Sequence, residues 1–107
     1  MRPPRKVKVG YRDFTVTARS VVEMNEERAL GLTFKDRALI DLDETLDRQQ
    51  MAETLLHETL HAIWHVQCLP GKAGEEQVVT ALSKGLAGVF RDNPEAIKWI
   101  LAGLKAK

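Results

Sequence analysis

The chain has a single cysteine, few aromatic residues and no long apolar run, and these absences exclude several classes of protein. Cys68 is the only cysteine in 107 residues, so no disulfide can form within one chain, and a lone thiol fits a reducing compartment. No apolar segment approaches the roughly 20 residues that a membrane-spanning helix needs. The basic start, residues 1–8, is not followed by an apolar segment and a cleavage site of small residues, so we read no secretory signal. These features predict a cytoplasmic protein that does not cross a membrane.

An excess of charge of either sign is also absent. The 16 basic and 15 acidic residues give a net charge of +1, which provides no general attraction to nucleic acid or to a membrane surface. The basic residues near the start lack interleaved aromatic side chains, which favours a solvated tail over a nucleic-acid site. The length suits one domain. We expect a flexible basic tail over residues 1–6 and a single domain over residues 7–107.

The first third of the chain has the alternating pattern of β-strands. Apolar residues alternate through residues 7–18, with an interruption at Gly10, which predicts two short strands or a bent hairpin. Residues 20–31 have no clear pattern. From Gly31 to Leu42 the chain again has an extended pattern, with a turn at Asp36-Arg37.

From Asp47 onward the apolar residues recur with helical spacing. Asp47 is a good N-cap for a first helix, which should end near Leu69-Pro70-Gly71. A second helix is expected over residues 75–90. Asn93 followed by Pro94 then predicts the start of a third helix, because proline is favoured at the first helical position. Strands followed by helices indicate an α+β fold.

The first helix carries the motif HExxH as His57-Glu58-Thr59-Leu60-His61. Residues four apart lie on one face of a helix, one turn from each other, so the two imidazoles can bind a single zinc ion. Zinc lowers the pKa of bound water to about 7, and Glu58 can accept the proton from that water and pass it to the leaving amine. The motif therefore predicts a catalytic zinc site with Glu58 as the general base.

A chance match is the alternative interpretation, and the surrounding residues argue against it. From Thr54 to Val66 the only ionisable groups are three histidines and Glu58. Burial of these groups in an otherwise apolar helix would be costly without a partner such as a metal ion.

A catalytic zinc needs a third protein ligand and an open position for water. His65 lies two turns from His57, about 12 Å along the axis of a straight helix, so one ion cannot bind both. We therefore favour a structural or substrate-facing role for His65. Glu75 and Glu76 begin the second helix, which an antiparallel helix pair would bring back beside the first. Periodicity does not decide between them, and either can instead be favoured simply by the positive end of the helix dipole.

The segments HETLHA and EEQVVTALSKGL, with RDNPEAIKWI after them, resemble the gluzincin metallopeptidases. Within that group the chain is similar to the compact phage- and mobile-element-type proteins related to the ImmA/IrrE and SprT-like groups. The resemblance covers about residues 7–104, and only HExxH is highly specific. It implies a small antiparallel or mixed sheet packed on the motif helix, which two further helices follow.

The resemblance also implies residue roles. In ImmA/IrrE-like proteins the third ligand is a glutamate with a small apolar residue three positions on and a polar residue four on. Glu76, with Val79 and Thr80, matches this spacing, and Glu75 does not. An extended substrate would pair with the edge of the last strand before the motif helix, here Leu39–Leu42. One departure from the pattern is the lack of an obvious second lobe to supply an oxyanion-stabilising histidine or tyrosine, because Tyr11 is the only tyrosine.

The sequence is compatible with two functions. The first is a zinc-dependent endopeptidase that acts on a specific protein substrate. The alternative is a regulatory or binding module of phage origin that keeps the metal-containing zincin fold but has little or no proteolytic activity. The enzyme is favoured because a purely structural zinc site normally uses four protein ligands and does not need Glu58.

Overall fold

The computed structural model describes residues 2–20 and 30–106 and has an α+β fold, which confirms the predicted class. The strands are β1 (Lys6–Val9), β2 (Arg12–Arg19), β3 (Gly31–Phe34) and β4 (Leu39–Asp43). The helices are α1 (Arg48–Val66), α2 (Glu75–Asp92) and α3 (Pro94–Leu104). Residues 21–29, within the stretch to which the sequence pattern assigns no element, lie outside the described residues.

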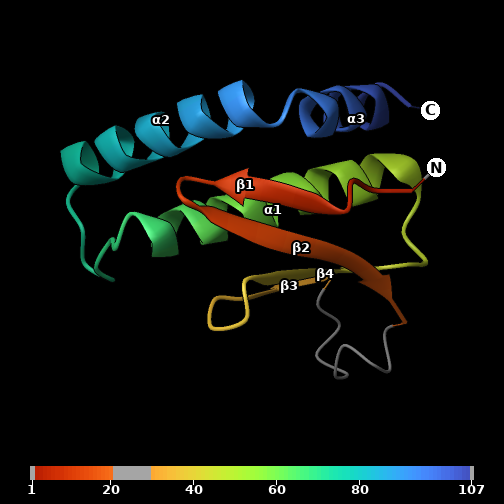
Figure 1. Ribbon diagram of the computed structural model, residues 1–107, viewed down its shortest axis with the longest axis horizontal. Helices are drawn as coiled ribbons and strands as arrows, with labels where there is room; N and C mark the ends of the chain where they lie inside the picture. Colours follow the sequence, from red (N-terminus) through yellow and green to blue (C-terminus); the bar gives the residue numbers. More distant parts are fainter. Residues whose placement is uncertain (1, 21–29, 107) are drawn as a thin grey trace.

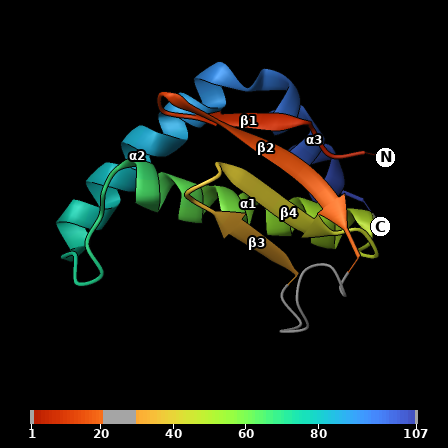
Figure 2. The same cartoon turned by 60° about the horizontal axis from the view of Figure 1, so that its bottom comes forward.

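The four strands form one mixed sheet with the order β1-β2-β4-β3 (Figures 1 and 2). β1 and β2 form the antiparallel hairpin that the alternating residues predict. β4 lies parallel to β2 and antiparallel to β3, so it has a neighbour on each side. This order corrects one expectation. The strand at Leu39–Leu42 is an inner strand whose main chain is already paired, and the outer strands are β1 and β3.

The core lies between one face of the sheet and the helices. Successive side chains of a strand point to opposite faces, so Val7 and Val9 of β1 and Phe14 and Val16 of β2 face the helices and are buried. Buried members of the core on the strands are Val7, Val9, Phe14, Val16, Ile40 and Leu42, and on the helices Met51, Leu55, Ala62, Ile63, Val89, Ala96 and Ile100. Because α1 supplies the largest share of helical core residues, it is held firmly against the sheet.

The first helix starts at the predicted cap. The side chain of Asp47 accepts a hydrogen bond from the backbone N–H of Gln50 at 2.8 Å. The helix ends at Val66, slightly before the predicted stop at Leu69, because Cys68 takes a left-handed conformation with φ of 56°. A left-handed residue just past the last turn is a common way to end a helix.

The second helix runs back beside α1 in the opposite direction, as the sequence predicts for an antiparallel pair, and α3 follows after a short bend (Figure 1). The two helices approach closely at Gly85, where a methyl group would overlap the side chain of Ile63. Glycine is needed at such a close approach because it has no side chain. Pro94 occupies the first position of α3, as predicted.

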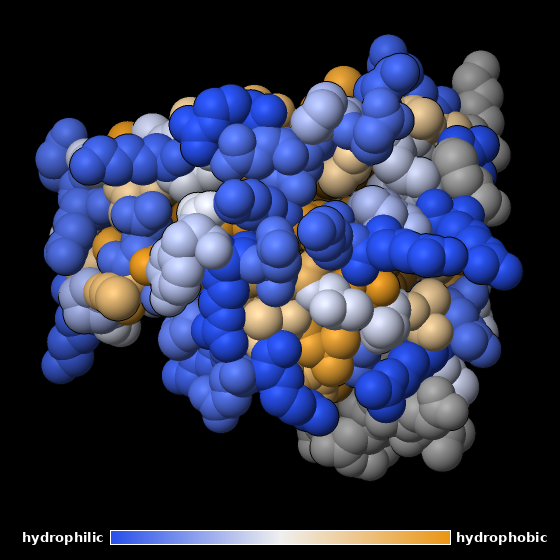
Figure 3. Space-filling view, in the orientation of Figure 1, coloured by the Kyte–Doolittle hydropathy of each residue, from blue (hydrophilic) through white to orange (hydrophobic). Residues whose placement is uncertain are grey.

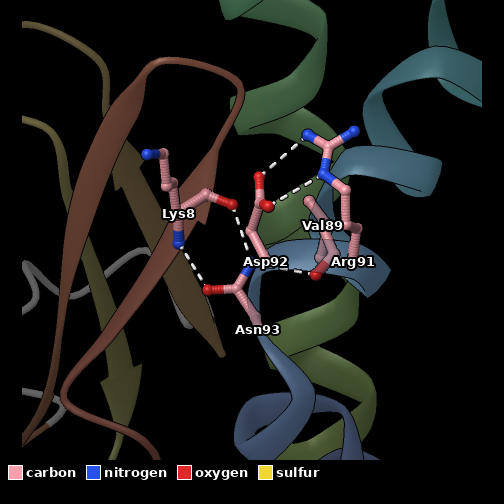
Figure 4. A network of polar contacts seen from close by, with 5 residues as sticks. All are labelled: Lys8, Val89, Arg91, Asp92 and Asn93. Atoms are coloured by element: carbon pink, nitrogen blue, oxygen red, sulfur yellow. Dashed lines mark hydrogen bonds and ion pairs between the residues drawn. The ribbon is translucent and has the colours of Figure 1, made fainter.

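Asn93 joins α2 to α3 and closes the outer edge of β1 (Figure 4). Its Oδ1 accepts the backbone N–H of Lys8 at 2.7 Å, and its Nδ2 donates to the carbonyl of Lys8 at 2.8 Å and to that of Val89 at 2.9 Å. The sequence predicts that the side chain of Asn93 caps α3, and this prediction is wrong, because the amide is engaged by Lys8 and Val89 and makes no capping hydrogen bond. Beside it, a hydrogen bond from Arg91 lowers the pKa of the half-buried Asp92 carboxyl. Within the described residues, only β3 keeps an edge without such a closure.

The face of the molecule in Figure 3 is mostly hydrophilic, with smaller apolar areas between the polar side chains. Among residues 2–20 and 30–106, no helix has the length and apolar character that a membrane crossing requires.

Candidate metal centre

The two histidines of the HExxH motif lie side by side in the second half of α1. Their Nε2 atoms are 3.2 Å apart, their ring centroids are 4.9 Å apart, and the ring planes are inclined by 68°. Residues i and i+4 are neighbours on a helix surface, which explains why His57 and His61 meet without any bend in α1. Both imidazoles are exposed, so their nitrogens can be reached from solvent.

The separation of 3.2 Å between the two Nε2 atoms is suited to one tetrahedral metal ion. Two nitrogens bound to zinc at about 2.0–2.1 Å with a tetrahedral angle are about 3.3 Å apart. The same distance also suits a single N–H···N hydrogen bond if one ring carries its proton on Nε2. The imidazole pair therefore fits two of the ligand positions of a zinc ion and needs only small side-chain adjustment to hold it.

Glu58 lies between the two histidines in the sequence and points toward the sheet. It is 6% exposed, and its Oε1 accepts a hydrogen bond of 2.6 Å from the hydroxyl of Thr33 on β3. Its other carboxylate oxygen has no hydrogen-bond partner among the described residues. The close approach of β3 to α1 makes this contact possible, because a side chain at Gly31 would meet Thr54 at 2.7 Å and Glu58 at 3.0 Å. β3 therefore fixes one oxygen of the carboxylate and leaves the other available.

A pocket of about 560 Å³ opens over these groups. It is bounded by β3 on one side and by the second half of α1 on the other. Its lining consists of Gly31, Leu32, Thr33, Lys35, His57, Glu58, His61, Trp64, His65, Cys68 and Leu69. His65 thus faces the same pocket as the imidazole pair, which is compatible with the expected substrate-facing role.

The third ligand expected from the sequence does not join the imidazoles. Among residues 2–20 and 30–106, no three His, Cys, Asp or Glu side chains are grouped closely enough to hold a metal ion. Glu75 and Glu76 are exposed in the first turn of α2. The residue of α2 that shares a pocket with His57 and His61 is Leu82. Glu76 lies six residues earlier, which is about 9 Å of helix rise.

The structure also identifies pocket residues that the sequence did not. Thr33 lies on β3 and Lys35 in the turn directly after it, both distant in sequence from the motif, and no local spacing links them to Glu58. Trp64 also lines the pocket, because its place one turn after His61 puts it on the same face of α1. Tyr11, the only tyrosine, is 81% exposed in the β1–β2 turn and does not line the pocket.

Comparisons of the chain with protein-family models, with curated proteins and with solved structures find no match.

Proposed function

We propose that this chain is a zinc-dependent endopeptidase in which His57 and His61 bind the metal and Glu58 is the general base. The main support is the imidazole pair, with Nε2 atoms 3.2 Å apart, next to a buried carboxylate in an open pocket. Bound there, zinc would act as a Lewis acid on the peptide carbonyl and would lower the pKa of a water ligand to about 7.

The chain's own residues account for the movement of the proton. Thr33 holds Oε1 of Glu58, so the second oxygen of the carboxylate is free to accept a proton from the attacking water. As the water oxygen bonds to the carbonyl carbon and the C–N bond breaks, Glu58 delivers this proton to the amine nitrogen that leaves. Because one oxygen of Glu58 is already held by Thr33, the carboxylate has little orientational freedom left to lose in the reaction, which favours a defined path for the proton.

The strand proposed to pair with the substrate is β3, in place of the strand at Leu39–Leu42 that the resemblance implies. Only an outer strand has main-chain groups available to a peptide, and β3 is the outer strand that also lines the pocket through Gly31, Leu32 and Thr33. A protein segment in extended form would add to this edge, with its scissile bond above the imidazole pair. The opposite edge, at β1, is closed by Asn93.

Glu76 is proposed as the third ligand, with Glu75 as the alternative. The proposal rests on the resemblance to gluzincins of the ImmA/IrrE and SprT-like type, and it requires the first turn of α2 to approach the imidazoles when metal binds. Both carboxylates are exposed, so neither must give up a buried partner to make this approach. A reducing compartment such as the cytoplasm suits the exposed lone thiol of Cys68.

One observation favours the alternative function, a zincin-like binding module of phage origin without proteolytic activity. No third ligand stands beside the imidazoles among the described residues. A protein with two histidine ligands would hold zinc weakly and would have an incomplete catalytic site. Such a protein could still bind a partner through the open edge of β3.

Metal analysis tests the site. Elemental analysis of wild type dialysed against micromolar zinc should give one zinc per chain, and His57→Ala should abolish this binding. His65→Ala is the matched control, because it removes an imidazole from the same helix and pocket and should retain the zinc. Full zinc content in His57→Ala would refute the assignment of the site.

Catalysis is tested with a pool of fluorogenic peptides that carry a donor and a quencher at their ends. Zinc-loaded wild type should cleave members of the pool. Glu58→Gln should bind zinc and abolish cleavage, since an amide is not a base at neutral pH. If wild type binds zinc and binds peptides of the pool without cleaving any, the binding module is the correct function.

A further inference from the structure

A second pocket adjoins the larger one along β3. It has a volume of about 420 Å³ and is lined by Leu30, Gly31, Glu53, Thr54, His57 and Glu58. Gly31, His57 and Glu58 line both pockets, so the two pockets meet at the proposed catalytic groups. We call the two pockets together the β3 cleft, and each pocket is one arm of it.

The direction of β3 decides which residues lie in which arm. Figure 2 shows β3 beside α1 and running in the same direction. At its start, Gly31 lies against Glu58, and directly after its end Lys35 lines the larger pocket together with His65. A strand advances by about 17 Å from Leu30 to Lys35, which is the length of about six extended residues. A short peptide paired with β3 therefore reaches both arms, with the proposed catalytic groups between its ends.

The two arms carry opposite charges. Apart from the motif residues, Glu53 is the only charged side chain in the arm at the start of β3 among the described residues. In the other arm the corresponding charge is that of Lys35, and no acidic side chain outside the motif lines that arm within the same residues. Both side chains are exposed, and neither has an ion-pair partner within residues 2–20 and 30–106. Each charge is therefore available to a ligand in the cleft.

We propose that the β3 cleft selects a peptide segment with an acidic side chain before the scissile bond and a basic side chain after it. Antiparallel pairing is the more stable arrangement of two strands, and it places the N-terminal part of the peptide beside Lys35 and the C-terminal part beside Glu53. A peptide with these charges in the reverse order would bring like charges together in both arms. The inference rests on the proposed peptidase function and adds the substrate class.

Two peptides of identical composition test this order of charges. Both have alternating threonine and valine residues in the middle, and a pair of glutamates and a pair of lysines occupy the two ends in opposite orders. Fluorescence polarisation with zinc-free wild type measures binding to β3 without cleavage. At about 20 mM salt the acid-first peptide should bind about 10-fold more tightly, because the small effects of several exposed charge pairs add up. At about 0.5 M salt screening should reduce the ratio to within about twofold.

A double charge reversal assigns the preference to the cleft. Lys35→Glu combined with Glu53→Lys keeps the net charge and should make the base-first peptide the tighter ligand. Glu95→Lys combined with Lys98→Glu is the matched control, because it exchanges two exposed charges on α3 outside both arms and should keep the wild-type ratio.

Equal binding of the two peptides by wild type, binding of neither, or an unchanged ratio in the cleft variant would overturn the inference. Cleavage by zinc-loaded wild type separates this result from the proposed function. Cleavage of both peptides at the same rate would overturn the charge selection and leave the peptidase standing. A preference in binding that the cleft variant inverts, without cleavage of either peptide, would support the charge selection and refute the peptidase.

Discussion

Replacing Thr33 by valine removes the hydroxyl that holds the proposed base and keeps the shape of the side chain. Glu58 is 6% exposed and has no other side-chain hydrogen bond among the described residues, so its carboxylate loses its only protein partner. A hydrogen bond to a charged group contributes about 1.5–3 kcal/mol to stability. We therefore expect the free energy of unfolding to fall by about 2 kcal/mol, which lowers the melting temperature by about 8–16 °C in a domain of this size.

A double-mutant cycle separates this effect from a simple change in packing. Urea denaturation at neutral pH should show that Thr33→Val costs about 1 kcal/mol less in the Glu58→Gln background, where the bond is between neutral groups. Thr33→Ser keeps the hydroxyl and should preserve most of the stability. In peptide cleavage, Thr33→Val should lower kcat by about tenfold with little change in KM, and Thr33→Ser should restore it. Equal costs in both backgrounds, or no rescue by serine, would refute the reasoning.

Three further predictions each concern one residue. Asn93→Ala should lower the free energy of unfolding by about 1–3 kcal/mol in urea denaturation, because three hydrogen bonds are lost, and Asp92→Asn at the neighbouring surface ion pair should lower it by less. Gly31→Ala should lower the rate of peptide cleavage by the zinc-loaded protein more than Gly71→Ala does. The added methyl group at Gly31 meets Thr54 and Glu58, whereas Gly71 has open space around it. Glu76→Ala should weaken zinc binding about tenfold or more in a competition titration, and an equal loss in Glu75→Ala would contradict the choice of ligand.

The elements were predictable because their signals are local. The alternating residues of β1 and β2, the cap at Asp47 and the proline at the start of α3 each concern residues within a few positions of one another. The same holds for the imidazole pair, because an i, i+4 spacing on a helix fixes the contact. These features depend on the regular spacing of side chains that every helix and every strand has.

The features that could not be predicted depend on how the elements are ordered in space. The sequence does not state that β4 inserts between β2 and β3, so the outer strand was assigned to the wrong element. The amide of Asn93 is a good helix cap by local rules, but Lys8 of β1 and Val89 of α2 together offer it three hydrogen bonds. The partnership of Thr33 with Glu58 spans 25 positions, and no spacing rule covers that range.

The position of Thr33 links the proposed binding of substrate to the proposed chemistry. β3 presents its outer main-chain edge to a peptide, and the hydroxyl of one of its residues holds the carboxylate of Glu58. Only β4 and α1 hold this four-residue strand among the described residues, so pairing with a peptide on its outer side would restrain it further. A peptide bound at this edge would therefore restrain the carboxylate of Glu58, through Thr33, as well as position the bond to be cleaved. A peptide that binds elsewhere in the pocket would lack this effect, so cleavage should depend on extended pairing with β3 and not on occupancy of the pocket alone.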